Sequence, residues 1–332
     1  MSGHLTARDD ARVWGLHFGL IAILFAAQYV LPDYHNGVMA RVMVLALFAM
    51  GYNVLFGYTG LLSLGHSMFF AAGLYGAGLP IYHFGVHPLP AFAIGIGCGT
   101  ALALLVGALA LRTTGVAFMI VTLMFAQVAY LMSLWLGEWT RGDEGLTLSR
   151  AERIIEIGPM FLDMTNRDTR YIIAWALFAL GLGITLLIAR SRFGRVLVAI
   201  RENEERARML GFDTFANKLA SVAISGAISA TAGAAYVLLF GYMGSTFASI
   251  QYSILPLLWV LLGGAATTLG PFFGTLLMFY LAEMSNDALN AWFPDARLNQ
   301  IGIVGVALIL LVLFFPKGLF GSIRERWLKW LP

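Results

Sequence analysis

The sequence predicts an all-α polytopic membrane protein, and three observations carry that prediction. Hydrophobic residues make up 59% of the 332 residues, while charged residues make up 12%, well below the ~25% usual in soluble proteins. The mean hydropathy is +0.80. Apolar runs long enough for a helix to cross a bilayer, about 18 residues or more, recur along the chain. We therefore expect about ten transmembrane helices in a single transmembrane domain over residues 1–332.

The predicted spans follow one another with short connections except at residues 138–170 and 190–218. The first run follows a polar N-terminal stretch and has no small-residue cleavage site after it, which favours a retained span over a cleaved signal peptide. The third and eighth runs contain many glycines, and we expect broken or re-entrant segments near 57–78 and 261–275. The ten runs cover residues 14–31, 38–57, 61–83, 88–111, 115–137, 171–189, 219–243, 252–268, 270–290 and 299–315.

The third run, GYTGLLSLGHSMFFAAGLYGAG from Gly57, contains six glycines. Irregular backbone at membrane depth is tolerated only where protein or an aqueous cavity surrounds it. A helix restarting near Ser63 or Ser67 would aim free N–H groups into the membrane, as transporters do to bind anionic groups. Close helix packing through small residues explains the glycines equally well. If the break lines a path, the candidate residues are Asn53, Ser63, Gly65, His66, Ser67, Thr122 and Gln127.

A second glycine-rich break, LLGGAATTLGPFFGT at 261–275, echoes the first. Leu269-Gly270 precedes two phenylalanines much as Leu64-Gly65 does. Two related halves of five spans each would have inverted topologies.

The longest charged run, residues 190–218, lies between two apolar runs. Glu202 precedes Arg206 by four residues and Glu204 precedes Arg208 by four, the favourable order for ion pairs on a helix. Val196, Ile200, Ala207 and Leu210 would share one face, and Gly211 stands where a helix end favours a left-handed residue. We predict an amphipathic helix over 191–211, either a solvated loop or a docking helix that a soluble partner grips.

The distribution of basic residues predicts the topology. With the N-terminus in the cytoplasm, the interior loops collect fourteen Lys and Arg residues and the exterior loops six. This bias places both termini and residues 190–218 inside the cell. The loop 138–170, with seven acidic and five basic residues, then lies outside, as a partner's docking site or a solvated cap.

Few ionisable residues lie at membrane depth. Arg41 sits near a span end, and Glu283 and Asp287 share a face towards the exterior end of the ninth run, so all three are expected to be interfacial. His66 by itself is more typical of a hydrogen-bonded structural histidine than of a proton relay. An ion-coupled transporter would need more intramembrane carboxylates or histidines than these.

The sequence lacks the residues that several kinds of activity require. The single cysteine, Cys98, allows no intrachain disulfide and no cysteine-based metal site. None of the three lysines follows a glycine, so the sequence contains no P-loop that could bind ATP. The motifs H-E-x-x-H and G-x-S-x-G do not occur either. No basic patch with interleaved aromatic residues indicates nucleic-acid binding. We therefore expect a chain that is not an enzyme and carries no cofactor or metal.

Five motifs in order resemble one known family. They are GYTGLLSLGHSMFFAAGLYGA (57–77), LRTTGVAFMIVTLMFAQ (111–127), AIRENEERARMLGFD (199–213), GGAATTLGPFFGT (263–275) and LFFPKGLFG (313–321). Together they are similar to the permease subunits of branched-chain amino-acid ABC importers, the LivH/LivM family, and their order and the chain length resemble the LivM-like partner more. The resemblance covers about residues 38–321.

The resemblance implies a permease in the bacterial inner membrane, surrounded by lipid. Its partners would be a second permease subunit in a heterodimer, two cytoplasmic ATPase subunits that bind the ATP, and a periplasmic solute-binding protein. The segment matching 199–213 would be the coupling helix that sits in a groove of the ATPase. Its candidate coupling residues are Arg201, Glu202, Asn203, Glu204, Arg208, Leu210 and Gly211.

One departure from the family bears on the solute. The exterior loop reads WTRGDEGLT at 139–147, with Arg141 where a glycine is usual and Glu144 as an added charge. The expected function is therefore translocation of branched-chain amino acids or a related small polar solute, with urea and short amides as alternatives. An ion-coupled secondary transporter and a purely structural membrane subunit are the rival classes.

Overall fold

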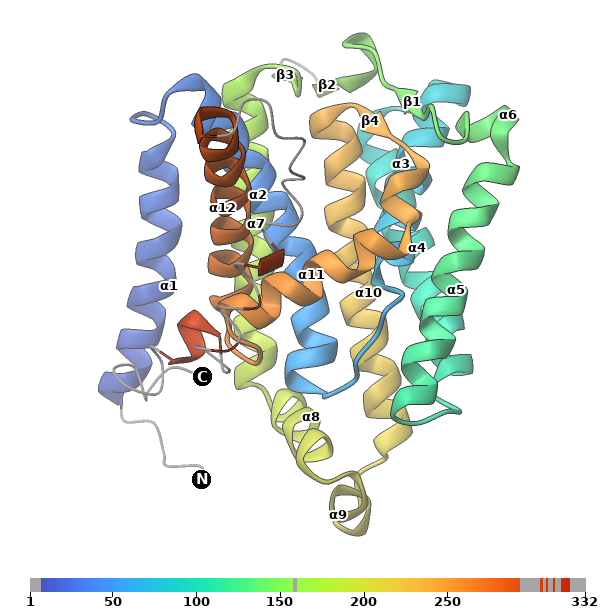
Figure 1. Cartoon of the computed structure of the whole chain (residues 1–332), viewed down its shortest axis with the longest axis vertical. Helices are drawn as coiled ribbons and strands as arrows, with labels where there is room; N and C mark the ends of the chain where they lie inside the picture. The colour runs from blue at the N-terminus through green and yellow to red at the C-terminus, as the bar shows by residue number, and fades with distance from the viewer. Residues whose placement is uncertain are drawn as a thin grey trace.

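The computed structural model describes residues 7–157, 160–292, 305–306, 309, 313 and 318–322. Long helices run side by side along one axis, and short strands gather at one end of them (Figure 1). The helices are α1 (Ala7–Ala27), α2 (Asp33–Asn53), α3 (His66–Phe84), α4 (Pro88–Ala110), α5 (Val116–Trp135), α6 (Gly137–Thr140), α7 (Arg167–Arg190), α8 (Arg192–Glu202), α9 (Glu204–Met209), α10 (Thr214–Phe240), α11 (Ile250–Gly263) and α12 (Gly270–Trp292).

The strands are short and lie in two antiparallel pairs. They are β1 (Leu146–Thr147), β2 (Ile154–Ile157), β3 (Met160–Asp163) and β4 (Tyr242–Met243). β1 pairs with β4, with Leu146 opposite Met243, and β2 pairs with β3 in a hairpin. Both pairs lie at the end of the bundle opposite α8 and α9 (Figure 1), so the segment 138–170, predicted as an exterior loop, is a structured cap tied to the end of α10.

Within the described residues, five helices are long and apolar enough to cross a membrane by themselves. They are α2 with its π-helical extension, α4, α5, α7 and α10. This confirms a helical, multi-pass membrane protein. The count of ten spans stays a prediction, because most of the tenth run, 299–315, lies outside the described residues.

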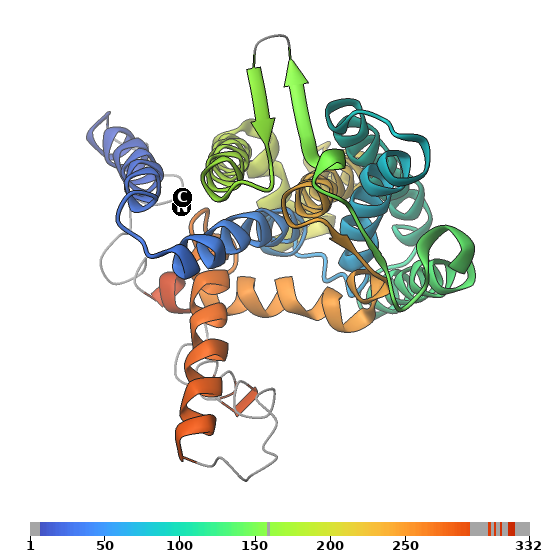
Figure 2. The same ribbon diagram turned by 90° about the horizontal axis from the view of Figure 1, so that it is seen from above.

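α2 and α10 form the centre of the bundle, and their apolar stretches are mostly buried, whereas those of α4, α5 and α7 are mostly not. α10 packs against α2, α3 and α4 (Figure 2). A Cβ atom added at Gly73 of α3 would lie 2.1 Å from the carbonyl oxygen of Ala230, and one at Gly233 would lie 2.0 Å from that of Phe70. Glycines inside α3 and α10 therefore allow close packing, as small residues do in membrane bundles.

The first predicted break is present. α2 continues into a π-helical segment, Val54–Tyr58, and residues 59–65 are irregular before α3 begins at His66. Gly60 has a φ of +76°, in the left-handed region that a glycine adopts without strain. Figure 1 shows the segment climbing from the lower end of α2 to the start of α3, within the height of the bundle. The helix restart lies at His66, between the two serines considered from the sequence.

The second predicted break is also present. α11 crosses the bundle obliquely and ends at Gly263, and α12 begins at Gly270 after an irregular segment (Figures 1 and 2). His17 of α1 reaches this segment, since its Nε2 lies 2.7 Å from Thr268 Oγ1. The side chain of Phe320 stacks on Phe273 with ring centroids 5.1 Å apart. The break is thus enclosed by protein, as its irregular backbone requires.

The charged stretch forms two helices, α8 and α9, where the sequence analysis expected one helix over 191–211. Asn203 interrupts them with φ −161° and ψ 103°, and its side-chain oxygen accepts a hydrogen bond from Arg206 N at 2.8 Å. An asparagine side chain competes for backbone donors in this way and favours a helix start over a helix interior. Glu202 and Arg206 consequently belong to different helices, whereas Glu204 and Arg208 form the expected ion pair at 3.3 Å.

Candidate functional site

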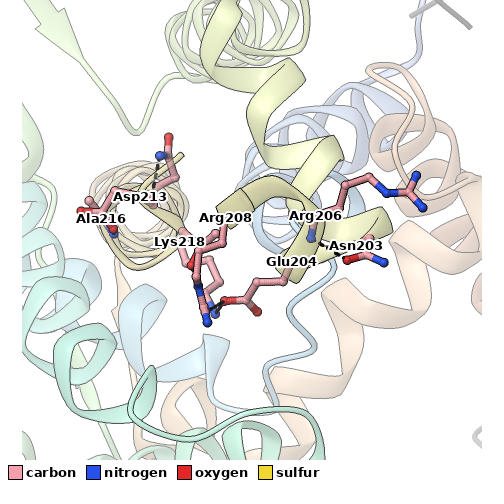
Figure 3. A network of polar contacts seen from close by, with 9 residues as sticks. Asn203, Glu204, Arg206, Arg208, Asp213, Ala216 and Lys218 are labelled. Atoms are coloured by element: carbon pink, nitrogen blue, oxygen red, sulfur yellow. Dashed lines mark hydrogen bonds and ion pairs between the residues drawn. The ribbon is translucent and has the colours of Figure 1, made fainter. Parts of the chain in front are cut away.

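α9 is held against the start of α10 by a compact set of charges. Lys218 Nζ lies 2.7 Å from Glu204 Oε1, and Arg208 Nη2 lies 3.3 Å from the same oxygen (Figure 3). Lys218 is buried, with 6% of its surface exposed, and a lysine rarely occupies such a place without a partner. Burial alone would raise the pKa of Glu204, but the hydrogen bond and charge of Lys218 outweigh it and keep that pKa below its ordinary value.

The end of α9 has a defined geometry. Gly211 has a φ of +89°, its N–H donates to Arg208 O at 3.0 Å, and Phe212 N–H donates to Ala207 O at 3.2 Å. This pair of bonds around a left-handed residue is the Schellman motif. The left-handed role predicted for Gly211 is confirmed. Asp213, directly before α10, caps that helix by accepting a hydrogen bond from Ala216 N at 3.0 Å (Figure 3).

The turn after α9 exposes apolar side chains. Met209 is 85% exposed and Leu210 is 70% exposed, and Phe212 and Phe215 are exposed beside them in the sequence. Leu210 was predicted to share one face with Ala207, but Ala207 is buried and Leu210 is exposed, because the helix ends at Met209 and the Schellman turn directs the next residues away. We call Met209, Leu210, Phe212 and Phe215 the apolar tip. Exposed apolar residues gathered on one element mark interaction surfaces.

α8 makes a direct link to the first helix break. Arg201, near the C-terminal end of α8, donates a hydrogen bond from Nη1 to the carbonyl oxygen of Gly57. A Cβ atom at Gly60 would lie 2.5 Å from Arg201 Cγ, so the stem of the arginine also lies on this segment. Arg201 therefore contacts the membrane part, whereas the sequence analysis assigned it to the surface that docks the ATPase.

Asn53 joins the two breaks to each other. Its Nδ2 donates to Thr267 O at 2.9 Å, and its Oδ1 accepts from Ala266 N at 3.0 Å. A Cβ atom at Gly57 would lie 2.1 Å from Asn53 Oδ1 and 2.6 Å from Ala266 N. One side chain thus holds residues more than 200 positions apart, and Gly57 supplies the space for it. The sequence indicates Asn53 as a candidate for the solute path but does not indicate which residues it contacts.

The remaining pathway candidates gather around residues 63–67, and most of their polar atoms have protein partners. Leu64 N–H donates to Thr122 Oγ1 at 3.3 Å, and Gly65 N–H donates to Ser63 Oγ at 3.2 Å. His66 Nε2 lies 2.7 Å from Ser225 Oγ. In this conformation these donors are engaged within the protein. Gln127 lies farther along α5 and is half-buried.

The N-terminal ends of α3 and α11 meet inside the bundle. Ser67 N–H donates to Ser253 Oγ at 2.9 Å, and the two serine hydroxyls lie 2.7 Å apart. Ser67 Oγ also donates to Ala248 O at 3.1 Å. Ser253 of α11 therefore satisfies a backbone donor at the start of α3, which has no partner within its own helix. Ser253 and Ala248 were not identified from the sequence, because only the packing of α11 on α3 brings them there.

Gly65 has a packing role in this arrangement. A Cβ atom at Gly65 would lie 2.2 Å from the backbone oxygen of Thr122. The glycine therefore allows the start of α3 to approach α5, and a larger residue would push the two helices apart. Replacing Gly65 disturbs packing whether or not a solute passes here.

Comparison with known proteins identifies similar chains. The family described as "Branched-chain amino acid transport system / permease component" matches residues 35–314. The high-affinity branched-chain amino acid transport system permease protein LivM of Salmonella typhimurium is 25% identical, over 92% of this chain and 75% of its own length. LivM of Escherichia coli is 26% identical, over 86% of this chain and 69% of its own.

A second group of relatives covers less of the chain. The autoinducer 2 import system permease protein LsrC of Photorhabdus laumondii is 26% identical, over 54% of this chain and 50% of its own length. No solved structure matches the chain. Both groups are named as permease proteins, and the names differ in the solute.

Proposed function

The chain belongs to the family of branched-chain amino acid transport system permease components, and we propose that it is the membrane-spanning permease subunit of an ABC importer driven by separate ATPases. Its relatives are transport permease components of the membrane and not enzymes. The proposed partners are a second permease subunit, two ATPase subunits that bind the ATP, and a periplasmic solute-binding protein.

The observation that carries the proposal is the α8–α9 unit, residues 192–209. It presents the exposed apolar tip at one end of the bundle, and the Glu204–Lys218 pair fixes α9 to α10. An exposed Met209 and Leu210 on a rigidly held helix suit an ATPase groove better than solvent. The candidate coupling residues divide accordingly: Asn203, Glu204, Arg208 and Gly211 shape the unit, Leu210 faces the partner, and Arg201 faces the membrane part. Glu202 ends α8 and is exposed.

The same contacts suggest how motion of α8–α9 would reach the membrane. Arg201 is hydrogen-bonded to Gly57, and Gly57 lies against the side chain of Asn53. That side chain is in turn hydrogen-bonded to Ala266 and Thr267. A displacement of α8 would therefore act on both breaks through one short chain of contacts. We propose that the residues around 63–67 form the closed part of the solute path and separate when the breaks move.

The proposed solute is a branched-chain amino acid or a related small polar molecule. The names of the LivM relatives support the first, and the LsrC relatives are named for another solute, autoinducer 2. We further propose that both termini and α8–α9 face the cytoplasm, because the interior loops of the predicted topology carry most of the basic residues.

The apolar tip gives the sharpest test of the proposed function. Leu210→Glu and Met209→Glu should each abolish copurification of the ATPase encoded with this permease, since a charge would have to be buried in an apolar interface. Leu89→Glu is the matched control, because Leu89 is also an exposed apolar residue, at 54%, but lies at the other end of the bundle. ATPase that stays bound to both tip variants, or ion-driven uptake by the purified chain without ATP, would refute the proposal.

A further inference from the structure

A second site lies at the end of the bundle opposite α8 and α9. A cavity of about 540 Å³ opens there between the first turns of α2 and α7, the end of α10 and the side of α12. Its volume falls within the roughly 300–1,000 Å³ of small-molecule sites. The lining residues that matter below are Gly37, Arg41, Arg170, Phe240, Phe279 and Glu283.

Two arginines share one aromatic ring in this cavity. The guanidinium carbon of Arg41 lies 5.3 Å from the centroid of Phe240, and that of Arg170 lies 5.7 Å from it. The ring partly compensates both cations, because its face carries negative charge. Two like charges on one ring nevertheless repel each other, and an anion between them would relieve that repulsion.

Arg170 also has an unused hydrogen-bond donor. Its Nε is buried and has no hydrogen-bond partner within the described part of the chain. A buried donor without a partner costs roughly 1–3 kcal/mol, more when it is charged, so such an atom indicates a missing acceptor. Guanidinium groups bind carboxylates through paired N–H donors. The acceptor that fits best is therefore a carboxylate of a bound molecule.

The cavity contains the opposite charge as well. Glu283 of α12 lines it, and so does Asp33 at the start of α2. Asp33 is already paired with Arg167, which leaves Glu283 as the carboxylate that would meet a cationic group. Val38, Phe240 and Phe279 supply apolar surface between the charges. The lining thus offers a cationic pole, an anionic pole and an apolar patch.

We propose that this cavity binds a free α-amino acid with an apolar side chain, its carboxylate at Arg41 and Arg170 and its ammonium group at Glu283. The assignment rests on the proposed function, which places this end of the bundle outside the cell, where solute arrives. It deepens that function by naming a site and a zwitterionic solute class. A neutral solute would leave both poles unpaired, and a purely anionic one would leave Glu283 unpaired.

Gly37 allows a direct test on the full-length chain without any partner. It lines the cavity, and a Cβ atom there meets nothing within 4 Å, so Gly37→Cys fits without strain. With Cys98→Ala as background, the introduced thiol is the only one in the chain. The measurement is the rate of modification by a neutral maleimide in phosphatidylcholine nanodiscs, with and without L-leucine.

We expect L-leucine to slow the modification. Leucinamide, which lacks the carboxylate, and 4-methylpentanoate, which lacks the ammonium group, should protect about tenfold less, as should urea. Arg41→Gln and Arg170→Gln should each raise the half-protecting concentration of L-leucine about tenfold, which corresponds to 1.4 kcal/mol. Glu283→Gln should make L-leucine and 4-methylpentanoate protect equally. Arg141→Gln, at an exposed arginine of the cap that does not line the cavity, is the control and should leave protection unchanged.

Three outcomes would overturn the assignment. They are equal protection by leucinamide or urea, no protection by L-leucine while the unprotected rate is ordinary, and slowing that occurs only in nanodiscs with anionic lipid, which would assign the arginines to a headgroup. The assay contains no ATPase, so a failure of docking at the apolar tip leaves it unaffected. Conversely, intact docking with no protection would refute the cavity assignment alone.

Discussion

At the scale of single residues, Asp163 and Glu204 each hold one element outside the membrane in place. Asp163 closes the β2–β3 hairpin by accepting from Thr165 N at 2.8 Å and from the Thr165 hydroxyl, and Arg150 Nη2 lies 2.6 Å from its other oxygen. The hydrogen bonds from Thr165 and the charge of Arg150 lower the pKa of Asp163 from 3.8 to about 2. The hairpin is therefore tied to the carboxylate form of one residue.

This pKa predicts a pH dependence of the cap. A lowered folded-state pKa contributes stability that is complete above the ordinary value of 3.8 and lost as the pH falls towards about 2. Protection of the Thr165 amide against exchange, relative to the intrinsic exchange rate at each pH, should therefore fall as the pH falls across that window. Asp163→Asn should exchange faster at neutral pH and show no such transition. An unchanged exchange rate in the variant would contradict the role given to the carboxylate.

Glu204 matters because its main partner is buried. Removing its charge leaves Lys218 uncompensated, and we expect Glu204→Gln to destabilise the start of α10 by roughly 1–3 kcal/mol, between the values for exposed and buried pairs. Limited proteolysis at α9 and thermal unfolding of the purified chain measure this loss. The double variant Glu204→Gln/Lys218→Met should recover most of it, since no buried charge then remains. A double variant as unstable as the single one would disprove the explanation.

At the scale of elements, the contacts of α8 separate docking from transmission. The apolar tip is exposed, whereas Arg201 is bonded to the carbonyl oxygen of Gly57 in the π-helical end of α2. π-Helical turns are frequent at functional sites because they loosen the regular ladder. The apolar tip and Arg201 therefore face different partners, and substitutions at the two places should have different effects.

Arg201→Gln tests the transmission role. A hydrogen bond from a charged donor is worth roughly 1.5–3 kcal/mol, so we expect uptake to fall at least about tenfold while the ATPase stays bound and hydrolyses ATP. ATP hydrolysis and solute uptake are measured together in proteoliposomes. Arg195→Gln, an exposed arginine on the same helix, serves as the control. Normal uptake by Arg201→Gln would show that α8 acts on the membrane part by another route.

At the scale of the whole molecule, the arrangement has two distinct ends. α1 begins at the end that carries α8 and α9, and the short strands lie at the opposite end with the cavity of Arg41 and Arg170 (Figure 1). A transporter needs different surfaces at the two sides of the membrane, and these two ends differ in this way. The breaks lie between the two ends, where Asn53 joins them.

The orientation in the membrane is a prediction at this scale. Glu205→Cys on α9 and Glu144→Cys in the cap, both at exposed positions, should be modified from opposite sides in a chain with Cys98→Ala. We expect an impermeant thiol reagent added outside intact cells to reach position 144 and not position 205. The fourteen basic residues of the predicted interior loops are the reason, since Lys and Arg resist translocation. Modification of position 205 from outside would invert the topology.

Most of the architecture follows from the sequence alone. Membrane-length apolar runs locate the helices, because a bilayer requires about 20 apolar residues for each span. The glycines near 57–78 and 261–275 locate both breaks, because they weaken a helix wherever they cluster. Gly211 identifies a helix end, because a left-handed residue without a Cβ costs little. Each of these properties is local, and a local pattern is enough to predict it.

Only the tertiary structure decided what the side chains meet. Asn203 divides the charged stretch because its side chain finds a backbone donor, and Leu210 is exposed because the helix ends before it. The serine and backbone donors near Ser67 are satisfied by α11, which lies over 180 residues away in the chain. The sequence predicts only that Arg41, Arg170 and Glu283 are interfacial or exterior residues. In the structure, three helices bring these residues to one cavity. These contacts depend on packing between residues far apart in the sequence. They therefore cannot be predicted from hydrophobic periodicity or from the spacing of motifs.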